Sequence, residues 1–174
     1  RERWMAAVAG EKPDRVPTDF WGTSEVEENL LRHLGLQTME AAYERLHIDR
    51  PFTVSDRYVG PALKPGSDAY GVVSTEVRYG TGSYLEATVH PLAAFETVEQ
   101  IEAGFTWPQA DWWDASTVRS QINNAGERPT SIMMAGVYTD YTKLRGMEQA
   151  FVDFAANQDV VEYCLGKMYD LAAE

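Results

Sequence analysis

The order of hydrophobic and polar residues predicts helices that alternate with short strands. Apolar positions recur at helical spacing in the first eight residues, and Gly10 follows as a residue that commonly ends a helix. Runs rich in β-branched and aromatic residues predict strands over 16–21, 51–55 and 130–135. Further helices are predicted over 25–34, 38–46, 97–103, 116–125, 143–156 and 159–173.

Two of these helices begin at the spacing of a capping box, in which two side chains satisfy each other's free backbone amides. Ser24 is followed three residues later by Glu27, and Thr97 is followed by Gln100. We therefore expect side-chain caps at both places.

Residues 73–79 alternate between apolar and polar side chains, the period of a strand with one covered face. Residues 84–89 can pair back across the glycine-containing turn at 80–82, so the sequence predicts an antiparallel hairpin. Strands that otherwise alternate with helices favour an α/β fold with a parallel sheet, and the length favours a single domain over 1–174.

Charge and cysteine content limit the classes of partner. With 15 basic and 27 acidic residues the formal net charge is -12, which repels a phosphate backbone, so we expect no nucleic-acid partner. The single cysteine, Cys164, excludes an intrachain disulfide framework and favours a cytoplasmic protein. The longest apolar run is far shorter than the ~20 residues of a membrane-spanning helix, so we expect no membrane insertion.

Candidate site residues follow the predicted strands, because ligands of α/β proteins bind beyond the carboxyl ends of the strands. They are Asp19 and Trp21 after the first strand, Asp56 and Arg57 after the second, and Tyr138 and Arg145 after the third.

Asp56 is the strongest catalytic candidate, because a carboxylate at such a position can act as an acid, a base or a charge stabiliser. The alternative is that Asp56 pairs with Arg57 or caps the turn. Arg145 has two interpretations as well, a contact to an anionic substrate or an ion pair with Glu148 on its own helix.

Other conspicuous residues favour structural roles. The three histidines have no partner at metal-ligand spacing, so no metal site is assigned. The tryptophans at 107, 112 and 113 favour an anchor for a surface loop over a shelf for a cofactor.

Several segments together resemble the uroporphyrinogen decarboxylase superfamily, which includes the cobamide-dependent methyltransferases. Their order and spacing extend over nearly the whole chain. The matching segments are RER at 1–3, GEKPDRVP at 10–17, YGTG at 79–82, PLA at 91–93, ETVE at 96–99, WP at 107–108, LRGME at 144–148 and FVD at 151–153.

The resemblance implies a (β/α)₈ TIM barrel, of which this chain supplies roughly the N-terminal half with an inserted β-hairpin. The absence of an initiator methionine and a last predicted helix without a stop signal agree with a part of a longer chain.

The resemblance also implies roles for single residues. The decarboxylase carries a Ser-Asp pair after its second strand, whose aspartate holds the pyrrole nitrogens of the substrate, and Ser55-Asp56 matches this pair. Its arginine-bearing segment after the first strand is absent, since residues 21–26 read WGTSEV. Leu144 stands where the decarboxylase has a substrate-contacting tyrosine, with Tyr138 and Tyr141 nearby.

The missing arginines favour the methyltransferase branch, because a tetrapyrrole with eight carboxylates requires positive groups. That branch implies a small-molecule substrate, a corrinoid protein as partner and a zinc ion held by a His-x-Cys pair and a distant cysteine, all outside this chain. Two alternatives remain open. One is decarboxylation of a porphyrinogen, and the other is a non-catalytic half-barrel module that acts as a homo-oligomer.

Overall fold

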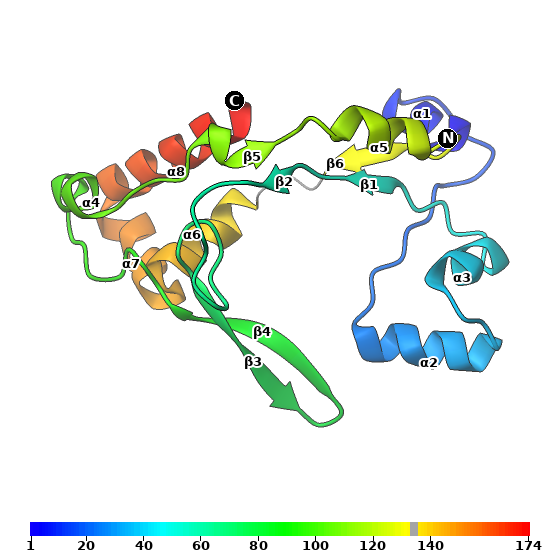
Figure 1. The fold of residues 1–174 in the computed structure, drawn as a ribbon, viewed down its shortest axis with the longest axis horizontal. Coiled ribbons are helices and arrows are strands. Elements are labelled where there is room, and N and C mark those ends of the chain that lie inside the picture. The colour runs from blue at the N-terminus through cyan, green and yellow to red at the C-terminus, as the bar shows by residue number, and fades with distance from the viewer. Residues whose placement is uncertain (133–135) are drawn as a thin grey trace. The chain divides into compact units, whose positions relative to one another are not determined.

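The computed structural model describes residues 1–132 and 136–174 (Figure 1). The strands are β1 (Phe52–Val54), β2 (Arg57–Tyr58), β3 (Val73–Tyr79), β4 (Gly82–Val89), β5 (Trp113–Asp114) and β6 (Thr130–Ile132). The helices are α1 (Glu2–Val8), α2 (Ser24–Leu34), α3 (Met39–Arg45), α4 (Val98–Gly104), the 3₁₀ turn η1 (Ala110–Trp112), α5 (Val118–Asn124), α6 (Val137–Arg145), α7 (Met147–Ala156) and α8 (Gln158–Ala173). Among the described residues no helix is both long and apolar enough to cross a membrane.

The chain divides into two compact units. Unit 1 combines residues 1–56 with residues 115–133, and unit 2 combines residues 57–114 with residues 134–174. Each unit is therefore built from two stretches of chain that are distant in sequence.

Unit 1 contains the parallel strand pair. β1 pairs with β6 in the register that places Phe52 opposite Thr130, and α5 lies against β1. The buried apolar side chains that the structure describes in this unit are Ala42, Val54 and Ala125, so its core is small.

Ion pairs connect the beginning of unit 1 to the segment before β1. Arg3 pairs with Asp14 at 2.6 Å and also contacts Asp49, while Arg15 pairs with Asp49 at 2.6 Å. The indole of Trp4 donates a hydrogen bond to the Asp49 carbonyl. These contacts give structural roles to charged residues of the segments 1–3 and 10–17.

Unit 2 has the larger core. Ten buried side chains form one hydrophobic cluster, to which α6, α7 and α8 contribute most members. The cluster consists of Val72, Leu92, Ile101, Tyr141, Leu144, Ala150, Val160, Val161, Cys164 and Met168.

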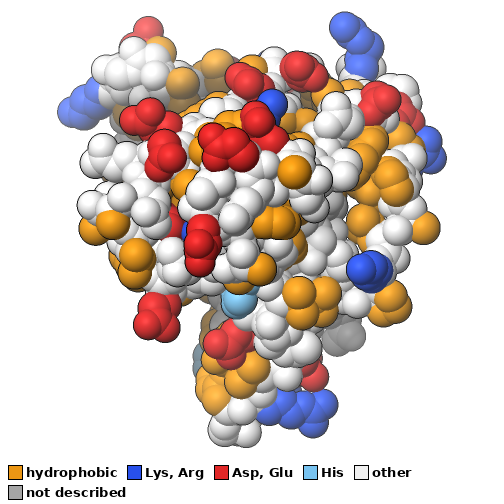
Figure 2. Space-filling model, turned by 90° about the vertical axis from the view of Figure 1, so that its left-hand side faces the viewer, with side chains coloured by type: hydrophobic (Ala, Val, Ile, Leu, Met, Phe, Trp, Pro, Cys, Tyr) orange, Lys and Arg blue, Asp and Glu red, His pale blue; other side chains and the backbone are white. Residues whose placement is uncertain are grey.

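Figure 2 shows acidic side chains scattered over one face of the molecule, as expected from the net charge of -12.

The β3–β4 hairpin confirms the prediction from the alternating pattern. Val77 lies opposite Tyr84, and the turn falls where the glycines predicted it. A bulge between Val73 and Ser74 shifts the register at the base of the hairpin.

The prediction of a half (β/α)₈ barrel is wrong for the part of the chain that the structure describes. The strands pair as three two-stranded sheets, and β1–β6 is the parallel pair among them. The strand predicted over 16–21 does not form, and Val16 and Trp21 are each 78% exposed. Pro17 offers no backbone donor to a strand ladder, which disfavours pairing there.

Three local predictions also need correction. Ser24 is the first residue of α2 and not its cap, since Thr23 occupies the cap position without a side-chain bond. The helix predicted over 143–156 is divided at Gly146, whose φ of +80° strongly favours glycine. β6 covers the first three residues of the strand predicted over 130–135, and residues 133–135 lie outside the described part.

Candidate functional site

The carboxyl end of β1 is held by a side chain from α5. The Gln121 amide accepts a hydrogen bond from the Ser55 backbone N–H at 3.1 Å and donates one to the Ser55 carbonyl at 2.7 Å. It also donates to the Thr117 hydroxyl at 3.1 Å, which orients the amide. Gln121 thus replaces a neighbouring strand for Ser55 and fixes the backbone directly before Asp56.

Asp56 is exposed at this end of β1. Among the residues that the structure describes, its carboxylate has no hydrogen bond and no ion pair. Arg57 instead pairs with Asp114 of β5, at 2.8 Å. The ion pair between Asp56 and Arg57, one of the two interpretations from sequence, is not present.

The hydroxyls of Thr53 and Ser131 lie 3.5 Å apart across the parallel pair. They stand one register position before the carboxyl ends of β1 and β6. These two hydroxyls and the Asp56 carboxylate make this end of unit 1 polar. Among the described residues no ion pair neutralises the charge of Asp56.

Asp19 and Trp21 are brought together by the structure. The Asp19 carboxylate accepts hydrogen bonds from the Phe20 backbone N–H at 2.7 Å and from the Trp21 indole at 3.0 Å. The ring of Trp21 remains 78% exposed. These residues follow Pro17 and Thr18. The Thr18 carbonyl accepts a hydrogen bond from the Asp49 backbone N–H.

The remaining candidates belong to unit 2 and have local partners. Tyr138 is 54% exposed on α6, and its ring stacks on Phe154 at a centroid distance of 5.9 Å. Arg145 is only 1% exposed, and its Nε donates to Asp153 Oδ2 at 2.6 Å. The guanidinium also donates to the carbonyls of Leu92 and Phe95. Arg145 therefore does not pair with Glu148, which lies on α7 and not on the helix of Arg145.

Burial and hydrogen bonds both shift the pKa values of the groups around Arg145. Burial alone would raise the pKa of Asp153, but hydrogen bonds from Arg145, Asn157, Gln149 and Tyr141 outweigh it and hold that pKa well below its usual range. Burial and the bond to Asp153 raise the pKa of the Tyr141 hydroxyl. This cluster is ionised and satisfied, so it leaves no free group for a ligand.

The described residues do not fit a zinc ion. No group of three His, Cys, Asp or Glu side chains able to hold a metal occurs among them. Cys164 is buried in the core of unit 2, where burial raises the pKa of its thiol to about 12. Because zinc binds the thiolate and not the thiol, this cysteine is a poor zinc ligand. We therefore derive no step of a reaction through zinc.

Sequence reasoning missed Gln121 and Asp153. Gln121 lies 66 residues from Ser55 in sequence, and Asp153 lies on the helix after that of Arg145, so neither pairing has a local signal. A glutamine among the polar residues of α5 gives no indication that its side-chain amide forms hydrogen bonds with the backbone at the end of β1.

Comparison with protein-family models, with curated proteins and with solved structures yields no match to this chain.

Proposed function

We propose that this chain belongs to an enzyme of the uroporphyrinogen decarboxylase superfamily, closer to its corrinoid-linked methyltransferases than to the decarboxylase. The enzyme acts on a small-molecule substrate in the cytoplasm and receives or delivers a methyl group through a corrinoid protein. Asp56 is the residue that contacts the substrate.

The carrying observation is the state of Asp56. An exposed carboxylate without a hydrogen bond or an ion pair among the described residues follows a backbone position that Gln121 fixes with two hydrogen bonds. A carboxylate held in this way can accept a hydrogen bond from a substrate N–H or O–H, or exchange a proton with it, without first breaking an internal contact.

A second support comes from the segments that carry the resemblance. Arg145 of the LRGME segment bonds Asp153 of FVD and the carbonyl of Leu92 in PLA, and Leu92 N–H donates to the Leu144 carbonyl at 2.9 Å. Three of the segments on which the resemblance rests thus contact one another in unit 2.

Decarboxylation of a porphyrinogen is the second candidate. The Ser55-Asp56 pair favours it, because this is the pair that the resemblance connects with pyrrole nitrogens. The buried ion pair of Arg145 argues against it, because that guanidinium is not available to substrate carboxylates. Titration of the chain with uroporphyrin tests this candidate, which requires a shift of the Soret band.

The test of the main proposal is methyl transfer from methylcobalamin to a panel of thiols and amines, followed by the visible spectrum of the cobalamin. We expect Asp56→Asn to lower the rate by about 100-fold or more, the usual effect of losing an acid or base. The matched control is Asp170→Asn, an exposed aspartate of α8.

Equal rates for the two variants and the wild type would remove Asp56 from the site. Absence of methyl transfer with every acceptor, together with a Soret shift on adding uroporphyrin, would favour the decarboxylase alternative instead.

A further inference from the structure

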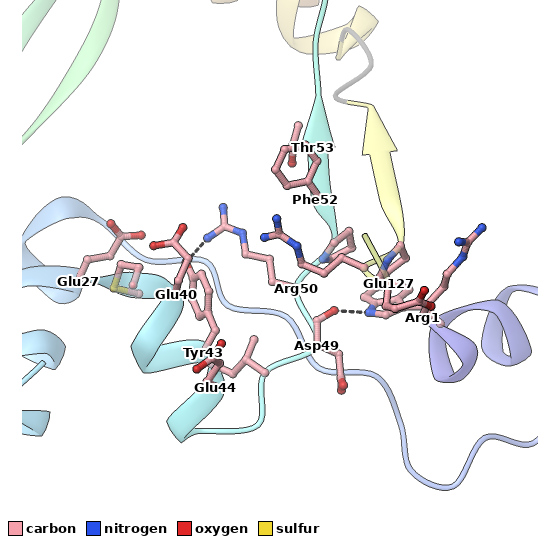
Figure 3. A pocket seen from close by; sticks show the side chains of 16 residues that line it. Arg1, Glu27, Glu40, Tyr43, Glu44, Asp49, Arg50, Phe52, Thr53 and Glu127 are labelled. Carbon is pink, nitrogen blue, oxygen red and sulfur yellow. Dashed lines mark hydrogen bonds between the residues drawn. The ribbon is translucent and has the colours of Figure 1, made fainter. Parts of the chain in front are cut away.

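Unit 1 contains a cavity of about 930 Å³ at the opposite end of β1 from Asp56. Its walls are the helices α2 and α3 on one side and the residues that lead into β1 and β6 on the other (Figure 3). The volume lies within the range of small-molecule sites, about 300–1,000 Å³.

Two arginines on the strand side are oriented by aromatic rings. The Arg50 guanidinium lies 5.2 Å from the centre of the Tyr43 ring and donates to the Tyr43 hydroxyl. The Arg128 guanidinium lies 4.5 Å from the centre of the Phe52 ring. Such cation–π contacts restrict a guanidinium without neutralising its charge.

Neither arginine has an ion pair among the residues that the structure describes. Two preorganised and unneutralised guanidiniums in one cavity favour binding of a carboxylate or a phosphate.

The helix side of the same cavity is acidic. Glu27 of α2 and Glu40 and Glu44 of α3 line it, and Figure 3 shows Glu27 and Glu40 on the helix side, with Arg50 and Phe52 toward the strand. The lining also includes Asp49, which Arg3 and Arg15 already neutralise, and Glu127 and Arg1 beyond the arginine pair. A ligand with negative charge alone would be repelled by the helix side, and one with positive charge alone by the arginines.

We propose that this cavity binds a small zwitterionic molecule. Its oxyanion group lies at Arg50 and Arg128, and its ammonium group faces the carboxylates of α2 and α3. Arg50 precedes β1, Arg128 precedes β6, and the carboxylates belong to α2 and α3, whereas Asp56 follows β1, so this site is separate from the proposed catalytic one.

The probe is O-phosphoethanolamine, compared by calorimetry with its two halves, inorganic phosphate and ethylamine. We expect the zwitterion to bind the full chain at least tenfold more tightly than either half, because linking the two groups makes the second contact intramolecular. Phosphate binding as tightly as the zwitterion, or no saturable binding of any probe, would overturn the proposal.

Two variants separate the charges. Arg50→Gln with Arg128→Gln is expected to weaken both phosphate and O-phosphoethanolamine by at least tenfold. Glu40→Gln with Glu44→Gln alters only exposed positions of α3 and should weaken O-phosphoethanolamine while leaving phosphate unchanged or tighter. Arg32→Gln, an exposed arginine of α2 outside the cavity lining, is the control for general charge.

Unchanged zwitterion affinity in the glutamate variant would overturn the ammonium half of the proposal, even if the arginine variant failed to fold. Since Asp56→Asn lies outside the cavity, its effect on methyl transfer is independent of these titrations, and failure of one proposal does not carry over to the other.

Discussion

Arg145 and Asp153 form an ion pair with almost no access to solvent. The two side chains are 1% and 0% exposed, and Tyr141, Gln149 and Asn157 also donate to the Asp153 carboxylate. A buried pair of this kind is sensitive to loss of either partner, because the other charge then stays buried without compensation.

Asp153→Asn is therefore expected to lower the free energy of unfolding by about 3–5 kcal/mol at neutral pH, measured by urea denaturation. The folded pKa of Asp153 lies below its unfolded value, so its stabilisation is complete above pH ~4 and is lost as the pH falls further. The difference between wild type and variant should shrink below pH 4. A difference independent of pH would mean that Asp153 is not ionised in the folded state.

Among the residues that the structure describes, His47 combines a side chain with a positive φ, 55°. It follows the last turn of α3. The His47 and Ile48 amides donate to the Glu44 and Tyr43 carbonyls, the bonds of a Schellman motif that glycine favours. His47→Gly should raise the stability of unit 1 by roughly 0.5–1 kcal/mol. The opposite substitution at the equivalent position of α2, Gly35→Ala, should lower the stability of unit 1. A loss of stability in both variants would contradict the assignment of His47 to a position that favours glycine.

Sequence reasoning at the residue scale placed Asp56 correctly after a strand but did not identify what surrounds it. Position after a strand is a local property, whereas the Gln121 amide and the Asp114 partner of Arg57 arrive from elsewhere in the chain. The same limit explains Arg145, whose local candidate Glu148 is not its partner.

At the scale of elements, the contact between α5 and the end of β1 determines how firmly Asp56 is held. Gln121→Leu removes both hydrogen bonds to Ser55. We expect the Ser55 amide to exchange with solvent at least about fivefold faster, since one lost bond is worth about 1 kcal/mol or more. Amide hydrogen exchange followed by NMR measures this directly. Ser120→Ala on the same helix is the control, and equal exchange in the two variants would show that Gln121 does not hold the strand.

Elements with strong local signals were predicted well. The hairpin of β3 and β4 and the Thr97 cap of α4, whose hydroxyl accepts from the Gln100 N–H at 3.4 Å, depend on neighbours in sequence. The strand at 16–21 was predicted wrongly, because an apolar run forms a strand only where another strand supplies hydrogen bonds. The break at Gly146 was missed because helical periodicity continues across it.

The whole molecule has two units with unequal cores. Unit 2 contains the cluster of ten buried side chains, while the buried apolar side chains described in unit 1 are Ala42, Val54 and Ala125. Since burial of apolar area is the main stabilising contribution, we expect unit 1 to be the less stable unit.

We expect the amides of unit 1 to exchange at lower urea concentration than those of unit 2, with Ala42 and Met168 as reporters. Two cap variants should act separately. Thr38→Ala removes the cap of α3 and should lower the opening energy of unit 1 alone by about 1 kcal/mol, whereas Thr97→Ala should affect unit 2 alone. Identical shifts in both units would show that the chain unfolds as one cooperative body.

Mapping of ligand contact along β1 tests directly whether Asp56 binds the substrate. Backbone amide shifts are recorded while the full chain is titrated with whichever thiol or amine supports methyl transfer. We predict the largest shifts at Ser55, Asp56 and Gln121, at the carboxyl end of β1, and small ones at Arg50 and Arg128. Shifts confined to other residues, with Ser55 and Asp56 unmoved, would contradict the assignment of Asp56 as the substrate contact.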